Sequence, residues 1–221
     1  MINDSDRIPK IACLFKGFSM RVQQKTYTPE EYFALEETAE FRSEYWNGEI
    51  IPMTGGSFDH NTLFVNFCAL LKFASRGKDF TVRAGDMRVW IPRYRLYAYP
   101  DVYVIQGNPT FQENRKDVVL NPKLIIEILS KSTQNYHKTD KLRAYRSISE
   151  FQEYLLVSQY EMYVEHRIKT DNGWVLREYE SDSAIIQLAS IGVELAIADI
   201  YEGVTFESET ETAIAPENLE E

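Results

Sequence analysis

Cysteine is scarce in this sequence, with Cys13 and Cys68 the only two among 221 residues. Two cysteines cannot build a disulfide framework, and their separation does not match the short spacings of metal-binding cysteine motifs. Because disulfides persist mainly in oxidising compartments, this usage predicts a cytoplasmic protein. No apolar run approaches the ~20 residues that a membrane-spanning helix requires. We therefore expect no membrane partner.

Positive charge is also in short supply. The chain carries 24 Lys and Arg against 34 Asp and Glu, a formal net charge of −10, and residues 207–221 hold acids and no bases. Proteins that bind DNA mainly by neutralising its phosphates are usually basic. The balance argues against tight, unassisted DNA binding. A bound cation or a local basic patch would still allow the protein to act on a polyanion.

Recognised loops and triads are missing too, since the sequence has no glycine-rich phosphate loop and no compelling Ser, His and Asp order. The composition, with 44% hydrophobic and 26% charged residues, is sufficient to build one hydrophobic core. We expect an N-terminal arm over residues 1–26, a folded domain over 27–206 and an acidic, disordered tail over 207–221. Met20 is a candidate for the true or an alternative start, and a genuine N-terminal arm is the other interpretation.

Local patterns predict the order of the elements. Thr28-Pro29-Glu30-Glu31 is typical of a capped helix start, and Asn47-Gly48 of a tight hairpin turn. Further helices are expected over 61–75, with His60 at its start, and over about 134–148; strands are expected over 80–91, 123–129, 153–157, 162–169 and 174–180. A strand, a helix and a second strand over 123–157 predict a parallel crossover. The fold class is α/β (α+β), with a mixed, twisted central sheet, helices on both faces and an antiparallel C-terminal meander.

Glu127 stands out because it lies inside the apolar run 124–129, which reads as a strand buried on both faces. An ionised carboxylate there is costly unless it is paired or coordinates a cation. Asp101 opens another strand directly after Pro100. If the two strands are neighbours, both carboxylates can converge on one cation that prefers oxygen ligands. The alternative is that Glu127 pairs with a core Arg or Lys while Asp101 caps a turn.

Pro100-Asp101, followed by an acidic strand residue and a lysine, resembles the PD-(D/E)xK motif of restriction-endonuclease-like nucleases. Other segments match in order and spacing the Uma-two family of that superfamily, over about Tyr27 to Val204; they are residues 27–32, 44–49, 60–61, 99–101, 127–130 and 153–156. The motif expects its lysine two residues after the glutamate, where this chain has Leu129. The resemblance implies that the lysine has moved to the following helix as Lys141, with Lys138 as the competitor.

The resemblance implies a Mg²⁺- or Mn²⁺-dependent endonuclease acting on DNA. Asp101, Glu127 and the carbonyl of Ile128 would hold the metal, and Lys141 would lower the pKa of the attacking water or stabilise the transition state. Glu44 matches a further acidic position that would hold a second cation or a metal-bound water; a solvated surface charge is the alternative.

The rival functions are a non-catalytic binding or regulatory module, and a small phosphoester hydrolase. Cutting both strands of a duplex favours a homodimer. The C-terminal aromatic residues Tyr160, Tyr163 and Trp174 are the expected contact surface.

Overall fold

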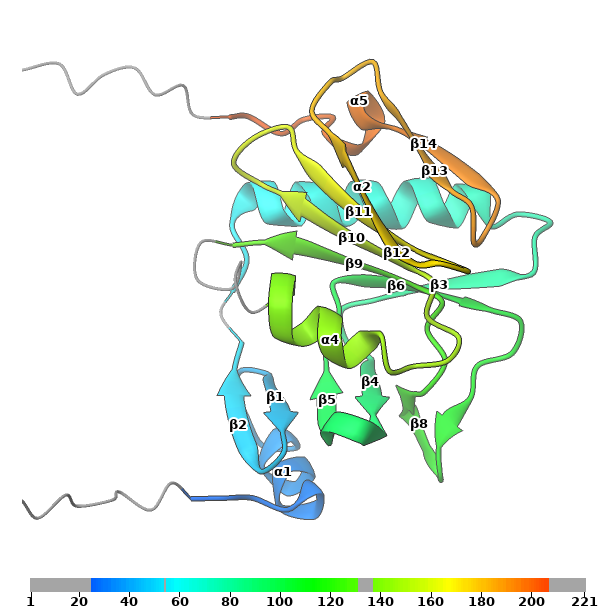
Figure 1. Ribbon diagram of the computed structural model, residues 1–221. Coiled ribbons are helices and arrows are strands. Elements are labelled where there is room, and N and C mark those ends of the chain that lie inside the picture. The colour runs from blue at the N-terminus through cyan, green and yellow to red at the C-terminus, as the bar shows by residue number, and fades with distance from the viewer. Residues whose placement is uncertain (1–24, 54, 131–136, 207–221) are drawn as a thin grey trace, which may run out of the picture.

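The computed structural model describes residues 25–53, 55–130 and 137–206. Most of its strands form two six-stranded sheets, here called sheet A and sheet B (Figure 1). In spatial order, sheet A contains β2 (Glu49–Pro52), β1 (Ser43–Trp46), β5 (Leu96–Ala98), β4 (Arg88–Ile91), β8 (Arg115–Val119) and β7 (Phe111–Gln112). Sheet B contains β12 (Gly173–Tyr179), β11 (Val164–Thr170), β10 (Glu153–Ser158), β9 (Leu124–Leu129), β6 (Val102–Gln106) and β3 (Phe80–Ala84).

Sheet B is the centre of the fold and is covered on both faces. Helix α2 (Phe58–Ala74) packs on one face and the short helix α4 (Leu142–Tyr145) on the other (Figure 1). All six residues of β9 are buried, and its side chains alternate between the two faces: Ile126 and Ile128 pack with the α2 side, Ile125 and Leu129 with the α4 side. The expectation of a strand buried on both faces is confirmed.

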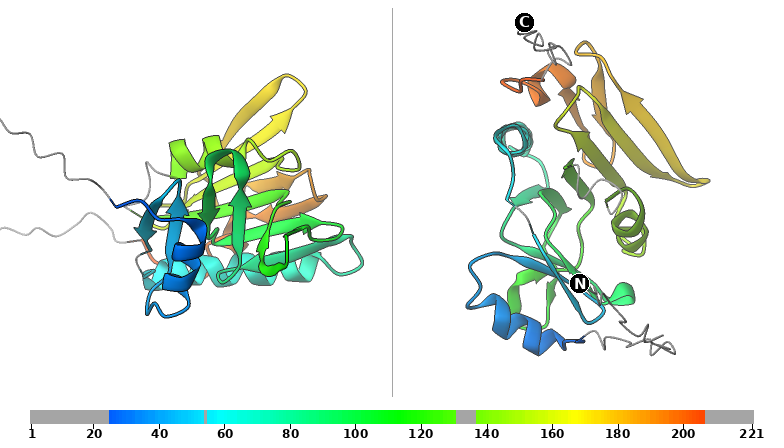
Figure 2. Two further views of the ribbon diagram at one scale, coloured as in Figure 1. Left: turned by 90° about the horizontal axis from the view of Figure 1, so that it is seen from below. Right: turned by 90° about the vertical axis from the view of Figure 1, so that its left-hand side faces the viewer.

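The remaining elements lie at the two ends of the molecule. Helix α1 (Pro29–Glu36) packs against sheet A at one end, whereas the β13 (Ile185–Leu188) and β14 (Val193–Ala196) hairpin and α5 (Ile197–Ile200) lie at the other (Figures 1 and 2). A 3₁₀ turn, η1 (Pro92–Tyr94), joins β4 to β5, and a π-helical turn, η2 (His137–Lys141), runs directly into α4.

Several sequence predictions are confirmed. Thr28 caps α1 in a reciprocal capping box with Glu31, and Asn47-Gly48 turns β1 into β2. Strands β9 and β10 pair in parallel, with Glu153 opposite Leu124, so the predicted crossover is present. Strands β11 and β12, and then β13 and β14, pair antiparallel. The mixed sheet with helices on both faces and antiparallel C-terminal strands is therefore the observed fold.

Other predictions are wrong in detail. The single strand expected over 80–91 is two strands in different sheets, because the chain turns at Gly85, whose φ of +69° favours glycine. The helix expected from Asn61 begins at Phe58, since Ser57 provides the N-cap by accepting from the backbone N–H of His60. Of the helix expected over 134–148, residues 137–145 are helical, and they begin with a wide π turn.

The turn at Gly85 also explains where the two sheets meet. The chain passes from sheet B to sheet A between β3 and β4, and returns between β5 and β6 at Pro100-Asp101. The two passages are hydrogen-bonded to each other, with the N–H of Gly85 donating to the carbonyl of Asp101 at 3.1 Å. The sequence motif at Pro100-Asp101 thus lies at the junction of the sheets.

The alternative start at Met20 and the acidic tail over 207–221 lie outside the described residues. Within residues 25–53, 55–130 and 137–206, none of the helices has the length and apolar character needed to span a lipid bilayer.

Candidate active site

Asp101 and Glu127 come from neighbouring strands. Strands β6 and β9 pair antiparallel with Val102 opposite Ile126, so one further step along the register places Asp101 opposite Glu127. The side chain of Asp101 spans this gap, because its Oδ2 accepts a hydrogen bond of 2.7 Å from the backbone N–H of Ile128. The structure thus makes neighbours of the two acid-bearing strands that the sequence nominated.

Lys141 lies between two acids, Glu127 and Glu44. It is the last residue of η2, and its Nζ is 3.1 Å from Oε1 of Glu127 and 2.8 Å from Oε1 of Glu44. The side chains of all three are almost fully buried, with 2%, 2% and 4% exposed for Lys141, Glu127 and Glu44. Glu127 is therefore paired with a buried lysine, as the alternative interpretation of the sequence allowed. The paired lysine is the one that the motif resemblance selected.

The protonation of Lys141 follows from these neighbours. Burial alone would lower the pKa of the ammonium group, but the charges of Glu127 and Glu44 outweigh burial and raise the pKa above its usual value. Beside these two carboxylates Lys141 is held in its protonated, positively charged form.

Tyr145 is a member of this cluster that sequence reasoning missed. Its hydroxyl donates to Oε1 of Glu127 at 2.9 Å, the same oxygen that Lys141 contacts. Burial, followed by the charge of Glu127, raises the pKa of the tyrosine well above its usual value, so the hydroxyl stays a donor. Tyr145 could have been recognised from its spacing, because it lies four residues after Lys141 and residues four apart share one face of a helix.

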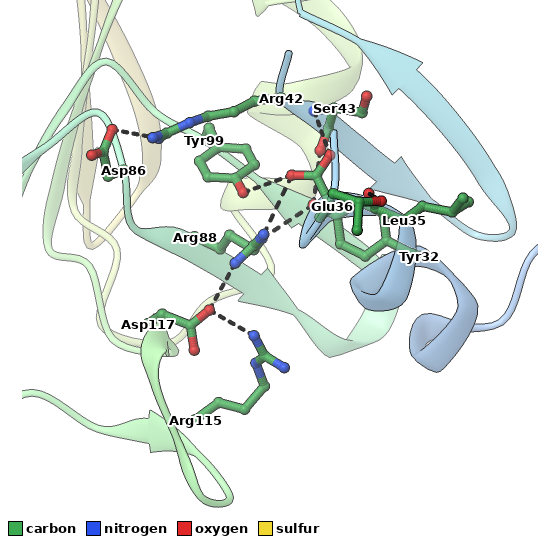
Figure 3. Close-up of polar contacts among 11 residues, drawn as sticks. Tyr32, Leu35, Glu36, Arg42, Ser43, Asp86, Arg88, Tyr99, Arg115 and Asp117 are labelled. Atoms are coloured by element: carbon green, nitrogen blue, oxygen red, sulfur yellow. Dashed lines mark hydrogen bonds and ion pairs between the residues drawn. The ribbon is translucent and has the colours of Figure 1, made fainter. Parts of the chain in front are cut away.

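Glu44 is held from the opposite side by Tyr99. The backbone N–H of Tyr99 donates to Oε1 of Glu44 at 3.0 Å, and the Tyr99 hydroxyl donates to Oε2 of Glu36 at 3.0 Å (Figure 3). The other oxygen of Glu36, Oε1, accepts from the backbone N–H of Ser43 at 2.9 Å. Glu36 on α1 therefore ties the start of β1 to the end of β5, the two segments that supply Glu44 and its donor.

Arg88 completes this support. Its guanidinium contacts Oε2 of Glu36 at 3.3 Å and Oδ2 of Asp117 at 2.7 Å, and Arg115 reaches the same Asp117 oxygen at 2.8 Å (Figure 3). Arg88 is mostly buried, so these contacts compensate a charge taken out of water. They link α1, β4 and β8 around Tyr99 at one side of the candidate site.

Lys138 and His60 occupy different positions. The Nζ of Lys138 pairs with Oε1 of Glu165 on β11 at 2.5 Å, outside the cluster. The Nε2 of His60 is 3.4 Å from Oδ1 of Asp101. Burial would lower the pKa of His60, but the hydrogen bond and charge of Asp101, with Glu127, raise it. Of the two candidate lysines, it is Lys141 that contacts Glu44 and Glu127, whereas Lys138 pairs with Glu165.

The family model for Uma2, described as "putative restriction endonuclease", matches residues 29–198. The chain belongs to the Uma2 family. Two proteins of Synechocystis sp. are similar to this Uma2 chain. Uncharacterized protein sll1609 is 40% identical over 166 residues, which are 75% of this chain and 94% of that protein. Uncharacterized protein slr1290 is 32% identical over 180 residues, or 81% of this chain and 93% of that protein.

A solved structure resembles the Uma2 chain in fold. The crystal structure titled as a putative nuclease belonging to DUF820, from Anabaena variabilis, superposes with a TM-score of 0.66. It is 19% identical, and the match covers 80% of this chain and 98% of the other. At this level of identity the likeness concerns the fold, which is that of a structure titled as a nuclease.

The donor set of the Uma2 chain fits a hard divalent cation. Mg²⁺ is commonly bound through one or two carboxylates, waters and substrate phosphates. Asp101 and Glu127 supply two carboxylates beside the Ile128 main chain, and with Glu44 they set three acids against the one charge of Lys141. Within the described residues, no three His, Cys, Asp or Glu side chains form a metal-binding group. Metal binding here would rest on two carboxylates and a main-chain carbonyl.

Proposed function

We propose that this Uma2 protein is a Mg²⁺- or Mn²⁺-dependent endonuclease that hydrolyses phosphodiester bonds of DNA. The observation that carries the proposal is the buried Lys141 bridging Glu44 and Glu127, with Asp101 on the neighbouring strand. A structural ion pair needs one acid and one base, whereas this cluster sets three acids, two of them on strands β1 and β9, beside one lysine. Carboxylates in excess can hold a divalent cation, which neutralises phosphate charge in phosphoryl transfer.

The residues divide the work as follows. Asp101, Glu127 and the carbonyl of Ile128 would hold the cation, which when bound neutralises phosphate charge and makes its water more acidic. Lys141 keeps its proton and would stabilise the negative charge that grows on the phosphate in the transition state. Glu44 would hold Lys141 in place, because its carboxylate contacts both the lysine and the backbone of Tyr99.

The position of Lys141 also bears on the rival functions. Leu129 at the motif position favoured a non-catalytic module, but Lys141 contacts the motif glutamate from a different element. A small phosphoester hydrolase would use the same residues, so the substrate must separate the two. DNA as the partner and the cytoplasm as the compartment belong to this proposal, as does a homodimer formed through the C-terminal strands.

Plasmid nicking tests the activity. Supercoiled plasmid should be nicked or linearised with Mg²⁺ or Mn²⁺ and left intact with EDTA. Asp101→Asn should abolish cutting, and Lys141→Met should reduce turnover by roughly two to three orders of magnitude. Lys138→Met is the matched control and should cut at nearly the wild-type rate. Turnover of mononucleotides or dinucleotides without nicking would support the small phosphoester hydrolase, and no turnover of either would support the binding module.

Metal binding is tested separately from turnover. Mg²⁺ or Mn²⁺ should raise the melting temperature of the wild type, because a ligand that binds the folded state stabilises it. Asp101→Ala should remove that rise. An equal rise in both proteins would contradict the ligand assignment.

A further inference from the structure

A chain of hydrogen bonds runs from the buried Gln159 to the exposed Ser57 and joins the end of β9 to the start of α2. Gln159, which directly follows β10 and is only 5% exposed, donates from Nε2 to the carbonyl of Leu129 at 2.7 Å. Its Oε1 accepts a short hydrogen bond from the hydroxyl of Ser57. That hydroxyl also accepts from the backbone N–H of His60 at 3.1 Å, and the ring of His60 contacts Asp101.

The two ends of this chain lie at the two halves of the candidate site. Leu129 follows Glu127 and Ile128 on β9, whereas His60 contacts Asp101 at the start of β6. The ring of His60 also lies close to Gly56, where a Cβ would lie 2.9 Å from the ring nitrogen Nδ1. A shift of α2 relative to β9 would therefore be passed on to Asp101 through His60.

We propose that Gln159 and Ser57 are positioning residues that set the spacing between Asp101 and the Glu127–Ile128 segment. The proposal rests on the metal site proposed above. Metal ligands must be held to within roughly 0.5 Å of a productive geometry. Groups that orient the ligands typically change metal affinity by about 10- to 100-fold when they are removed. Ser57 and Gln159 orient the ligands indirectly, by fixing the elements that carry them.

Four substitutions separate positioning from helix capping. Gln159→Leu keeps the approximate size of the side chain and removes both of its hydrogen bonds. Ser57→Asp keeps an acceptor for the N–H of His60, and so the cap, but cannot donate to Gln159 when ionised. Its added negative charge would by itself attract a cation, which is opposite to the expected loss. Ser57→Thr keeps both functions, and Thr28→Ala, which removes the cap of α1, is the control for lost capping alone.

The measurement is a titration of the full-length protein with Mn²⁺ or Mg²⁺, followed by the rise in melting temperature over each variant's own metal-free value. Gln159→Leu and Ser57→Asp should need about tenfold or more metal to give the same rise in melting temperature as the wild type. Ser57→Thr and Thr28→Ala should match the wild type. The same rise at the same metal concentration in Gln159→Leu and Ser57→Asp, with only a lower metal-free melting temperature, would refute positioning. A wild type that does not respond to metal would instead refute the metal site itself, and this inference with it.

Discussion

Replacing Lys141 by methionine tests the buried cluster most directly. Methionine keeps most of the apolar stem of the lysine and removes the ammonium group that Glu44 and Glu127 share. Removing one partner of a buried, hydrogen-bonded ion pair typically costs about 3–5 kcal/mol, because the other charge stays buried. For a domain of this size each kcal/mol lowers the melting temperature by roughly 2–4 °C. We therefore expect Lys141→Met to melt about 6–20 °C below the wild type in metal-free buffer.

Urea unfolding followed by the fluorescence of the three tryptophans measures this cost. Adding Glu44→Gln to Lys141→Met should restore part of the lost stability, since contacting residues are not additive and couple by about 0.5–3 kcal/mol.

Lys138→Met provides the matched control, because Lys138 is 26% exposed and the mostly buried Glu165 keeps its contact with Arg167 at 2.9 Å, so the loss should be about 1 kcal/mol or less. If Lys141→Met unfolds within about 1 kcal/mol of the wild type, like this control, the reasoning from buried charge is wrong.

Two further predictions follow from the contacts of the site and its support. Tyr145→Phe removes one donor to Glu127 and should lower the free energy of unfolding by about 1–3 kcal/mol in urea, while Lys141 still binds the same oxygen. Asp117→Asn should make the protein less sensitive to acid: burial would raise the pKa of Asp117, but Arg115 and Arg88 hold it below its ordinary 3.8. A lowered pKa gives stability that is complete above the ordinary value and lost as the pH falls through the folded value, so wild type and variant should converge below pH 3.8 in acid melts. Divergence in acid would contradict the role of Arg115 and Arg88.

The parts of the fold that depend on local pattern were predictable from the sequence. The apolar run 124–129 predicted β9, Asn47-Gly48 predicted the first hairpin, and Thr28-Pro29 predicted the start of α1, because each signal lies within a few residues. The division into two sheets was not predictable in this way. It depends on a left-handed turn at Gly85 inside a segment that otherwise reads as one strand.

The candidate site shows the same limit. Asp101 and Glu127 were nominated by their positions on apolar strands, and Lys141 by resemblance, but their distances depend on how three separate elements pack. Arg88 pairs with Glu36, which is 52 positions away in the sequence. The pair could therefore not be predicted from the residues that flank either one. The role of Ser57 and Gln159 is likewise invisible in sequence, since 102 residues separate them.

The placement of the lysine on a helix has a consequence for how the cluster is completed. At the motif position, Leu129 packs into the core with α4, whereas Lys141 arrives on the segment that follows the strand. The complete cluster therefore exists only when η2 and α4 are packed against sheet B. A chain in which η2 and α4 are not packed would keep Glu44 and Glu127 without the ammonium group that offsets their charges.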